Sequence, residues 1–368
     1  MCIALLLGVP VIAYSAIKMV VGGAASCPGC IIYPVTPVIL CEAPEFCTRT
    51  MAPDWTNPNV FYGTDMTDCR KSVDGGDTWN DCAANPSGTA VYPHYAVASD
   101  GSVLAAGNDS GGTVLRIRKS VNGGAVWSQV YESATEDGGG AFAGHTRLKC
   151  SQSTTEKLCV FVYKDVSNNA ISVVSRDNGD SWVADTTIGT IVYNPNGLAL
   201  TNDGLLGIVQ PDTSNGFSNY KAVLWDNASW EVSTIWPATT GSCYEQFVLN
   251  GARMGICRVG ATGTSYELRS ETGVVQKTFT LLDGFTGAIT SGLAYSVVTN
   301  WLAMLKPDSG GNTGIWISLD SGTSFIKVYS ATGPIGSQSD VFSANGCANG
   351  CMYFSYVNGG GSTVGKIC

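Results

Sequence analysis

The sequence predicts an all-β protein, a seven-bladed β-propeller with a repeated turn motif, preceded by an apolar N-terminal arm. Three observations predict this fold class. The chain is rich in glycine and poor in charge, a short motif recurs at a nearly constant interval, and the C-terminal region supplies three strands of a last unit instead of four. A six-bladed ring with an appendage is the alternative. We expect residues 1–32 to form the arm and its linker, and residues 33–368 the propeller.

The composition is that of short strands joined by turns. The 368 residues include 45 glycines, and charged residues make up 13% of the chain, against about 25% in an average soluble domain. Acidic residues outnumber basic ones by 29 to 20, and the longest basic cluster is Arg116–Lys119. This balance does not support nucleic-acid binding. No Gly-rich phosphate loop stands at a strand-to-helix turn, so we expect no nucleotide cofactor and no other cofactor.

An eight-residue pattern, Ser-x-Asp-x-Gly-x-Ser/Thr-Trp, recurs along the chain. Ser and Asp side chains at this spacing can bond the amides of a turn, glycine supplies a positive φ, and the aromatic ring packs under the turn. The pattern therefore predicts a β-turn with a small core of its own. Its four copies carry, at the defining positions, Ser72, Asp74, Gly76 and Trp79; Ser120, Asn122, Gly124 and Trp127; Ser175, Asp177, Gly179 and Trp182; and Ser318, Asp320, Gly322 and Phe325.

The aromatic residue of the pattern shows that the repeat is periodic. The aromatic positions are evenly spaced along the chain, at Trp79, Trp127, Trp182, Trp230, Phe279 and Phe325. A period of about 48 residues with four short strands per unit is typical of propeller blades. In the second unit we expect strands at 94–99, 103–106, 114–119 and 126–131, which places the turn motif between the third and fourth strands.

The two ends of the chain are expected to close the ring together. Residues 340–344, 352–356 and 363–367 provide three strands of the last unit, and a strand starting near Tyr33 would supply the missing outer one. A ring closed in this way has no open edge at the junction. Cys368 would then lie near Cys41 or Cys30 and form a covalent latch.

The 14 cysteines favour disulfides and an oxidising compartment. The CxxC segment Cys27–Cys30 lacks the second pair of a zinc site and the flanking residues of a haem or redox motif. Other cysteines are spaced like partners on two strands of one hairpin, and the expected pairs are Cys69 with Cys82, Cys150 with Cys159, Cys243 with Cys257, and Cys347 with Cys351.

Residues 1–23 are apolar and contain one charged side chain, Lys18. Three interpretations compete: an arm that docks into a neighbouring copy of the chain, a membrane anchor, and a secretory signal ending near Gly22–Ser26. Pro10 and the absence of a basic residue before the apolar run weaken the last two. We favour the assembly arm, with membrane contact through residues 1–23 as the alternative.

The repeated pattern resembles the Asp-box, the bacterial neuraminidase repeat of sialidases, the sortilin ectodomain and xyloglucan-hydrolysing propellers. The resemblance covers about residues 55 to 330 and implies a propeller fold. It does not carry over a sialidase site, because the family's Phe/Tyr-Arg-Ile-Pro motif is missing before the first copy. Tyr244 and Glu245 resemble the family's nucleophile pair, but adjacent residues on a strand point to opposite faces. Arginines beside the motif, Arg116, Arg118, Arg176 and Arg269, are expected on solvated faces.

A second group of polar residues marks the starts of the predicted innermost strands, at the end of the ring opposite the turn motifs. Such a ring of side chains could bind a small polar ligand or a glycan, and the two histidines titrate near neutrality. The alternative is an ordinary solvated strand edge, which we favour. The residues are His94, His145, Asn196, Tyr244, Glu245 and Asp340.

These observations favour an exported, non-catalytic propeller that builds an extracellular filament or a virion-surface spike with copies of itself. A membrane-anchored lectin or adhesin and a divergent glycoside hydrolase are the alternatives. Two N-glycosylation sequences, at Asn108 and Asn227, lie in predicted surface turns and agree with export.

Overall fold

The computed structural model separates the chain into two compact units, Met1–Pro34 and Val35–Cys368. The structure describes parts of the second unit: residues 38–41, 50–54, 56–57, 59–64, 68–84, 86, 94–108, 114–133, 147–151, 157–164, 169–190, 196–200, 206–212, 219–225, 230–236, 240–249, 252–259, 265–270, 274–280, 293–296, 301–332, 340–343, 352–358 and 361–367. The expected arm lies outside these residues. No helix long and apolar enough to cross a membrane occurs within them.

The described residues form an all-β structure in which 28 strands pair into seven antiparallel sheets of four strands each. We number the sheets in chain order. Sheet 1 contains β2 (Thr50–Pro53), β3 (Phe61–Thr64), β4 (Cys69–Ser72) and β5 (Asn80–Asp81); sheet 2, β6 (His94–Val97), β7 (Val103–Asn108), β8 (Leu115–Ser120) and β9 (Ser128–Glu132); sheet 3, β10 (Arg147–Cys150), β11 (Cys159–Lys164), β12 (Asn169–Ser175) and β13 (Val183–Thr190); sheet 4, β14 (Asn196–Leu200), β15 (Leu206–Asp212), β16 (Asn219–Trp225) and β17 (Trp230–Trp236); sheet 5, β18 (Thr240–Leu249), β19 (Ala252–Val259), β20 (Ser265–Ser270) and β21 (Val275–Thr280); sheet 6, β22 (Leu293–Ser296), β23 (Trp301–Pro307), β24 (Thr313–Ser318) and β25 (Ile326–Ala331); and sheet 7, β26 (Asp340–Ser343), β27 (Met352–Asn358), β28 (Gly361–Ile367) and β1 (Val38–Cys41).

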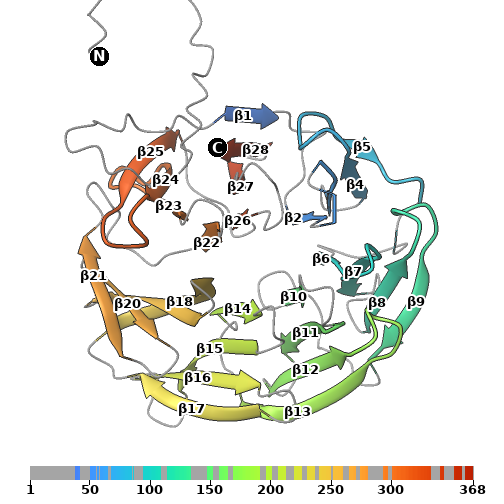
Figure 1. The fold of residues 1–368 in the computed structure, drawn as a ribbon, viewed down its shortest axis with the longest axis horizontal. Helices are drawn as coiled ribbons and strands as arrows, with labels where there is room; N and C mark the ends of the chain where they lie inside the picture. The colour runs from blue at the N-terminus through green and yellow to red at the C-terminus, as the bar shows by residue number, and fades with distance from the viewer. Residues whose placement is uncertain are drawn as a thin grey trace, which may run out of the picture. The chain divides into compact units, whose positions relative to one another are not determined.

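Within the second unit the sheets follow one another around a common centre (Figure 1). The first strand of each sheet lies nearest the centre, and the fourth strand lies at the periphery. From sheet 1 to sheet 7, each first strand contacts the first strand of the next sheet. Because the strands of each sheet are antiparallel neighbours, the turns from first to second strand and from third to fourth strand lie at the same end of the ring. We call this the box end; the first strands start at the opposite end.

The ring is closed by strands from both ends of the chain. β1 pairs antiparallel with β28 as the outer strand of sheet 7, with Val38 opposite Lys366. Sheet 7 in turn packs against sheet 1, where the ring centroids of Phe61 and Tyr353 are 4.5 Å apart. The described part of the closing strand is Val38–Cys41, and the expected start near Tyr33 lies outside the described residues. The proposed latch at Cys368 lies outside the described residues.

The hydrophobic core lies between adjacent sheets. In β7, Val103 and Ala105 pack into the cluster shared with sheet 1, whereas Leu104 and Ala106 pack into the cluster shared with sheet 3. Successive side chains of a strand point to opposite faces, and both faces of a sheet inside the ring are covered. A continuous apolar run such as Val103–Ala106 is therefore buried on both sides.

Several sequence expectations need correction at the level of single residues. β9 begins at Ser128 instead of at 126, because the amide of Val126 still belongs to the preceding turn and bonds the Asn122 side chain. Asn108 is the last residue of β7, opposite Leu115, and not a turn residue. Asn227 lies outside the described residues.

One expectation about side-chain direction was also wrong. Arg269 is buried and forms an ion pair with Glu267 on the same strand, instead of lying on a solvated face; Arg176 is exposed as expected. In β18, the register shifts between Cys243, opposite Cys257, and Glu245, opposite Ile256, so Tyr244 is the extra residue of a β-bulge. Strict alternation does not hold at a bulge, so the expectation that Tyr244 and Glu245 point to opposite faces stays a prediction.

Candidate functional site

The four copies of the turn motif connect the third and fourth strands of sheets 1, 2, 3 and 6. We call them box turns 1 (72–79), 2 (120–127), 3 (175–182) and 4 (318–325). In box turn 3, the Ser175 hydroxyl donates to Asp177 Oδ1 at 2.7 Å and accepts the Gly179 amide at 2.7 Å. Asp177 Oδ1 accepts the Ser181 amide at 2.9 Å. The serine and the aspartate together therefore bond two amides that the strand ladders leave unpaired.

The same serine and carboxylate bonds recur in the other copies, with one variation. Box turns 1 and 4 reproduce them around Asp74 and Asp320. In box turn 2, Asn122 replaces the aspartate and Val126 replaces the hydroxyl residue. The Ser120 hydroxyl and the Val126 amide still donate to Asn122 Oδ1, each at 2.9 Å, and the bond to a hydroxyl at position 126 is lost. An amide oxygen is thus sufficient to hold the turn, and the carboxylate adds a second bond to a hydroxyl.

These bonds stabilise the ionised form of the box carboxylates. Partial burial raises the pKa of Asp74, but the hydroxyl and amide of Thr78 and the hydroxyl of Ser72 lower it by more, so its pKa lies below the ordinary value. The pKa of Asp177 and that of Asp320 are lowered in the same way by Ser181 and Ser324. A carboxylate that accepts several hydrogen bonds is a poor proton donor at neutral pH, so these residues are unsuited to general acid catalysis.

The box glycines allow each turn to pack closely on the preceding sheet. Gly179 has φ +87°, and a Cβ placed on it would lie 2.6 Å from Leu104 Cδ2 in sheet 2. Gly124 has φ +89°, and its Cβ would lie 3.1 Å from Cys82 Sγ in sheet 1. Positive φ and the short approach both require glycine.

The box aromatics also reach toward neighbouring structure. The indole Nε1 of Trp182 donates to the Gly179 carbonyl at 3.1 Å within its own turn. The indole of Trp127 instead donates to the carbonyl of Ala84, after sheet 1, at 3.0 Å. In box turn 4, Phe325 packs on Phe279 of sheet 5 with ring centroids 4.4 Å apart. The aromatic position therefore joins sheets as well as filling its turn.

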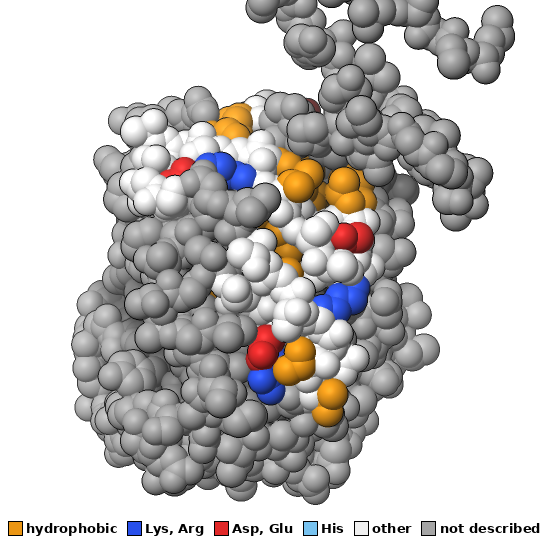
Figure 2. Space-filling model, turned by 90° about the vertical axis from the view of Figure 1, so that its left-hand side faces the viewer, with side chains coloured by type: hydrophobic (Ala, Val, Ile, Leu, Met, Phe, Trp, Pro, Cys, Tyr) orange, Lys and Arg blue, Asp and Glu red, His pale blue; other side chains and the backbone are white. Residues whose placement is uncertain are grey.

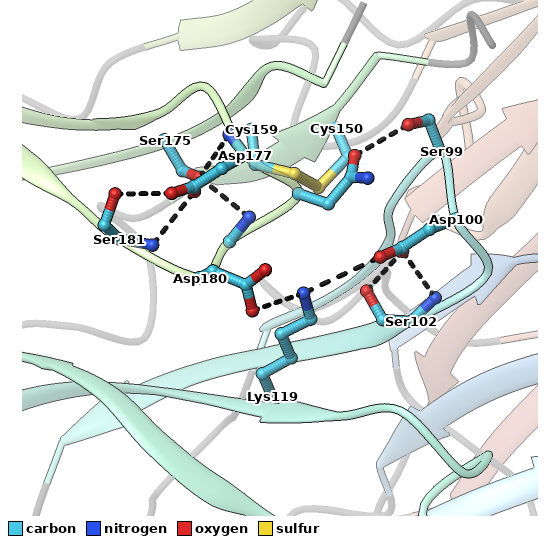
Figure 3. A network of polar contacts seen from close by, with 12 residues as sticks. Ser99, Asp100, Ser102, Lys119, Cys150, Cys159, Ser175, Asp177, Asp180 and Ser181 are labelled. Atoms are coloured by element: carbon cyan, nitrogen blue, oxygen red, sulfur yellow. Dashed lines mark hydrogen bonds and ion pairs between the residues drawn. A yellow bond between two sulfur atoms is a disulfide. The ribbon is translucent and has the colours of Figure 1, made fainter.

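A lysine from the preceding sheet contacts each box turn. Lys119 of β8 lies between the two sheets it joins, with its Nζ 2.8 Å from Asp180 of box turn 3 and 3.7 Å from Asp100 of its own sheet (Figure 3). Lys277 of β21 donates to the Ser321 carbonyl of box turn 4 at 2.8 Å. The remaining two contacts are Lys71 to the Gly123 carbonyl of box turn 2 at 3.2 Å, and Lys366 to Asp77 of box turn 1 at 3.6 Å.

Sequence reasoning missed these lysine contacts. Lys71 and Lys119 directly precede the motif serine of their own sheet, Ser72 or Ser120, and this position is visible in the sequence. Their partners, however, belong to the following sheet, 52 and 61 residues further on. Only the ring arrangement brings the two together.

Two of the expected disulfides are formed. Cys69 and Cys82 are bonded across β4 and the end of β5, and Cys150 and Cys159 across β10 and β11. The first lies beside Gly124 of box turn 2, and the second is drawn next to box turn 3 in Figure 3. Cys243 and Cys257 are opposite one another in the ladder of β18 and β19, without described side chains. Cys347 and Cys351 lie outside the described residues.

The predicted polar ring is only partly visible. His94, Asn196 and Asp340 are the first residues of β6, β14 and β26, so their backbones lie at the end of the ring opposite the box turns. His94 is half-buried. Tyr244 and Glu245 lie within β18, four and five residues after its first residue Thr240, and not at a strand start. His145 lies outside the described residues. The described side chains contain no cluster of three potential metal ligands.

Solved structures similar to this chain are β-propellers. YCF48 bound to a D1 peptide matches with a TM-score of 0.58 and 14% identity over 92% of this chain and 98% of that chain. The Dos1 propeller matches with a TM-score of 0.52 and 12% identity over 83% of this chain and 75% of that chain. An α-L-arabinanase of Penicillium chrysogenum matches with a TM-score of 0.49 and 13% identity over 91% of this chain and 98% of that chain.

These identities show the fold alone: the chain folds as a β-propeller. No protein-family model matches the sequence, and a comparison with curated protein sequences finds no match.

Proposed function

We propose that this protein is a non-catalytic, exported structural subunit of an extracellular or virion-surface assembly, a filament or a spike, whose copies are joined through the apolar arm of residues 1–32. The fold that accompanies this proposal is a seven-bladed propeller of the Asp-box superfamily. The observation that carries it is the division of the chain into a compact propeller unit and a separate N-terminal unit, in which Lys18 is the one charged side chain of the segment 1–23.

The uses of the described polar groups support a structural role. The carboxylates of Asp74, Asp177 and Asp320 are hydrogen-bonded within their own turns. Lys119 and Lys277 hold the next sheet in place. The carboxylates thus stabilise their turns and the lysines stabilise junctions between sheets, which supports a structural role for these groups.

Export is supported by the disulfides and by the sequence. The bonds Cys69–Cys82 and Cys150–Cys159 are stable in oxidising compartments and rare in the cytosol. Asn108 and Asn227 provide two acceptor sequences for N-glycosylation. These features support a location outside the cell or on the surface of a cell or virion.

A membrane-anchored glycan-binding adhesin is the second candidate. It is favoured by the backbone positions of His94, Asn196 and Asp340, which start first strands at one end of the ring. Polar side chains gathered at such a mouth are typical of sites for small polar ligands. In this candidate residues 1–23 would contact lipid instead of protein.

Electron microscopy and light scattering of the full chain, beside a chain lacking residues 1–32, test the proposal. Regular fibres or oligomers from the full chain only would support an arm that joins subunits. Single propellers from both chains, with the full chain soluble only in detergent, would reject the structural assembly and support the adhesin. The next experiment would then be a glycan array, with a His94→Ala variant beside the unchanged chain to test whether any binding depends on His94.

A further inference from the structure

The exposed apolar side chains of the described residues are confined to one part of the ring. Seven large apolar side chains are at least 40% exposed. Each of them lies in a connection between the third and fourth strands of a sheet, or is the first residue of a fourth strand. They are Val73 in box turn 1, Val121 and Val126 in box turn 2, Val183 after box turn 3, Val274 and Val275 at the start of β21, and Ile326 after box turn 4. We call these seven residues the apolar rim.

Their common position is more informative than their exposure. Single exposed valines are ordinary on protein surfaces. A third-to-fourth strand connection always lies at the box end, so the rim belongs to the outer margin of a single end of the ring. The side of the ring that carries β21 and β25 shows apolar side chains in separate spots, interspersed with polar side chains and with charges of both signs (Figure 2). A surface of this kind is suited to an apolar partner that touches several sheets in turn.

We propose that the apolar rim is the docking surface for the N-terminal arm, residues 1–23, of a second copy of this chain. This inference rests on the proposed function and names the acceptor surface that the assembly would use. The composition of the arm matches the rim, because every residue of the arm except Lys18 is uncharged. Burying apolar side chains of both partners together removes both from water, which favours association.

Charge favours the arm over a second rim as the occupant. The box end carries exposed carboxylates, among them Asp74 and Asp320, whereas Asp77 and Asp180 form ion pairs with Lys366 and Lys119. Two rims placed face to face would bring these carboxylates toward one another, and like charges across an interface oppose association. The one charged side chain of the arm, Lys18, has the opposite sign. An arm lying along the rim is therefore electrostatically compatible with it.

The length of the arm also fits a partner that crosses more than one sheet. The segment 1–23 would reach about 35 Å as a helix and about 75 Å as a strand. Val121 lies in box turn 2 of sheet 2, and Val183 begins β13 of the adjacent sheet 3. One arm can therefore contact the rim residues of neighbouring sheets such as Val121 and Val183.

Charged substitutions in the full chain test the acceptor surface. The variant Val121→Lys/Val183→Lys replaces two exposed side chains, which leaves the core unchanged. Thr280→Lys adds the same charge to an exposed residue at the far end of β21 and is the control. We expect the double variant to need an at least tenfold higher concentration for half-maximal assembly, measured by light scattering, and Thr280→Lys to assemble like the unchanged chain.

Cross-linking locates the arm directly. A photoreactive amino acid in place of Ile12, in a mixture of isotopically heavy and light full chains, is expected to form heavy-to-light cross-links to residues 120–127 or 175–183. Unchanged assembly of the double variant, or cross-links only to the end where His94 begins β6, would overturn the rim as acceptor while leaving arm-dependent assembly intact. Failure of the unchanged full chain to assemble would overturn both proposals.

Discussion

The Nζ atom of Lys366 lies 3.6 Å from Oδ1 of Asp77. This ion pair joins the third strand of sheet 7 to box turn 1 of sheet 1. The same relation, a lysine of one sheet with the box turn of the next, recurs at Lys71, Lys119 and Lys277. The ring junction between the two ends of the chain is therefore built like its internal junctions. Box turns act between sheets as well as within them.

Replacing these lysines is expected to destabilise the fold in proportion to their burial. The Lys119 side chain is 5% exposed and has two carboxylate partners, whereas the Lys366 side chain is 25% exposed and has one. Lys119→Met should lower the free energy of unfolding by about 1–2 kcal/mol, and Lys366→Met by less than about 1 kcal/mol. Urea unfolding followed by tryptophan fluorescence measures both, and an equal loss in the two variants would refute the burial argument.

Box turn 3 predicts a difference between two substitutions of one residue. Asp177→Ala removes the acceptor for the Ser181 amide and hydroxyl and should cost about 1–3 kcal/mol. Asp177→Asn keeps the amide bond, as Asn122 does in box turn 2, and should cost about 1 kcal/mol less. Thermal unfolding of both variants gives the comparison. Equal destabilisation would mean that the bond to the hydroxyl, and not the one to the amide, holds the turn.

Two glycines with positive φ separate backbone strain from steric contact. Gly311 has φ +76° and no atom within 4 Å of the position that a Cβ would take, whereas Gly179 has φ +87° and the Leu104 side chain within 2.6 Å of that position. Gly311→Ala should cost about 1 kcal/mol from strain alone, and Gly179→Ala about 1–3 kcal/mol more from overpacking. Calorimetry of the two variants measures the difference. If both lose the same stability, Leu104 moves aside without cost.

The box carboxylates predict acid sensitivity. The pKa values of Asp74, Asp177 and Asp320 are lowered in the folded protein, so their hydrogen bonds contribute stability above the unfolded-state pKa of about 3.9. This contribution is lost as the pH falls below about 4 and through the folded-state values. The midpoint of thermal unfolding should therefore be flat above about pH 5 and fall steeply below about pH 4.

A variant without the three titrating box carboxylates separates their contribution to the pH dependence of thermal unfolding from that of other groups. Asn cannot titrate, so the triple variant Asp74→Asn/Asp177→Asn/Asp320→Asn should show a shallower fall between about pH 4 and pH 2. The unchanged chain measured in the same buffers is the reference. Identical slopes in the two proteins would assign the acid sensitivity to other groups.

Local repeats made much of this fold predictable. The motif places its own serine, carboxylate and glycine within one short segment, so its hydrogen bonds follow from sequence distance alone, and the cysteines of a hairpin reveal their partner in the same way. Contacts between sheets were not predictable, because the partners of Lys71 and Lys119 lie 52 and 61 residues away. The burial of Arg269 beside Glu267 and the bulge at Tyr244 could not be predicted either, because the residue types at these positions do not indicate them.

The pairing of β1 with β28 has a consequence for the order in which the ring is built. Of the described strands, β1 is synthesised first and its partner β28 last. Until β28 has been synthesised, β1 has no partner strand in sheet 7. The incomplete ring then presents open strand edges at both ends, and such edges can pair with other chains. The final step of folding is therefore a contact of very long sequence separation, which is expected to be slow.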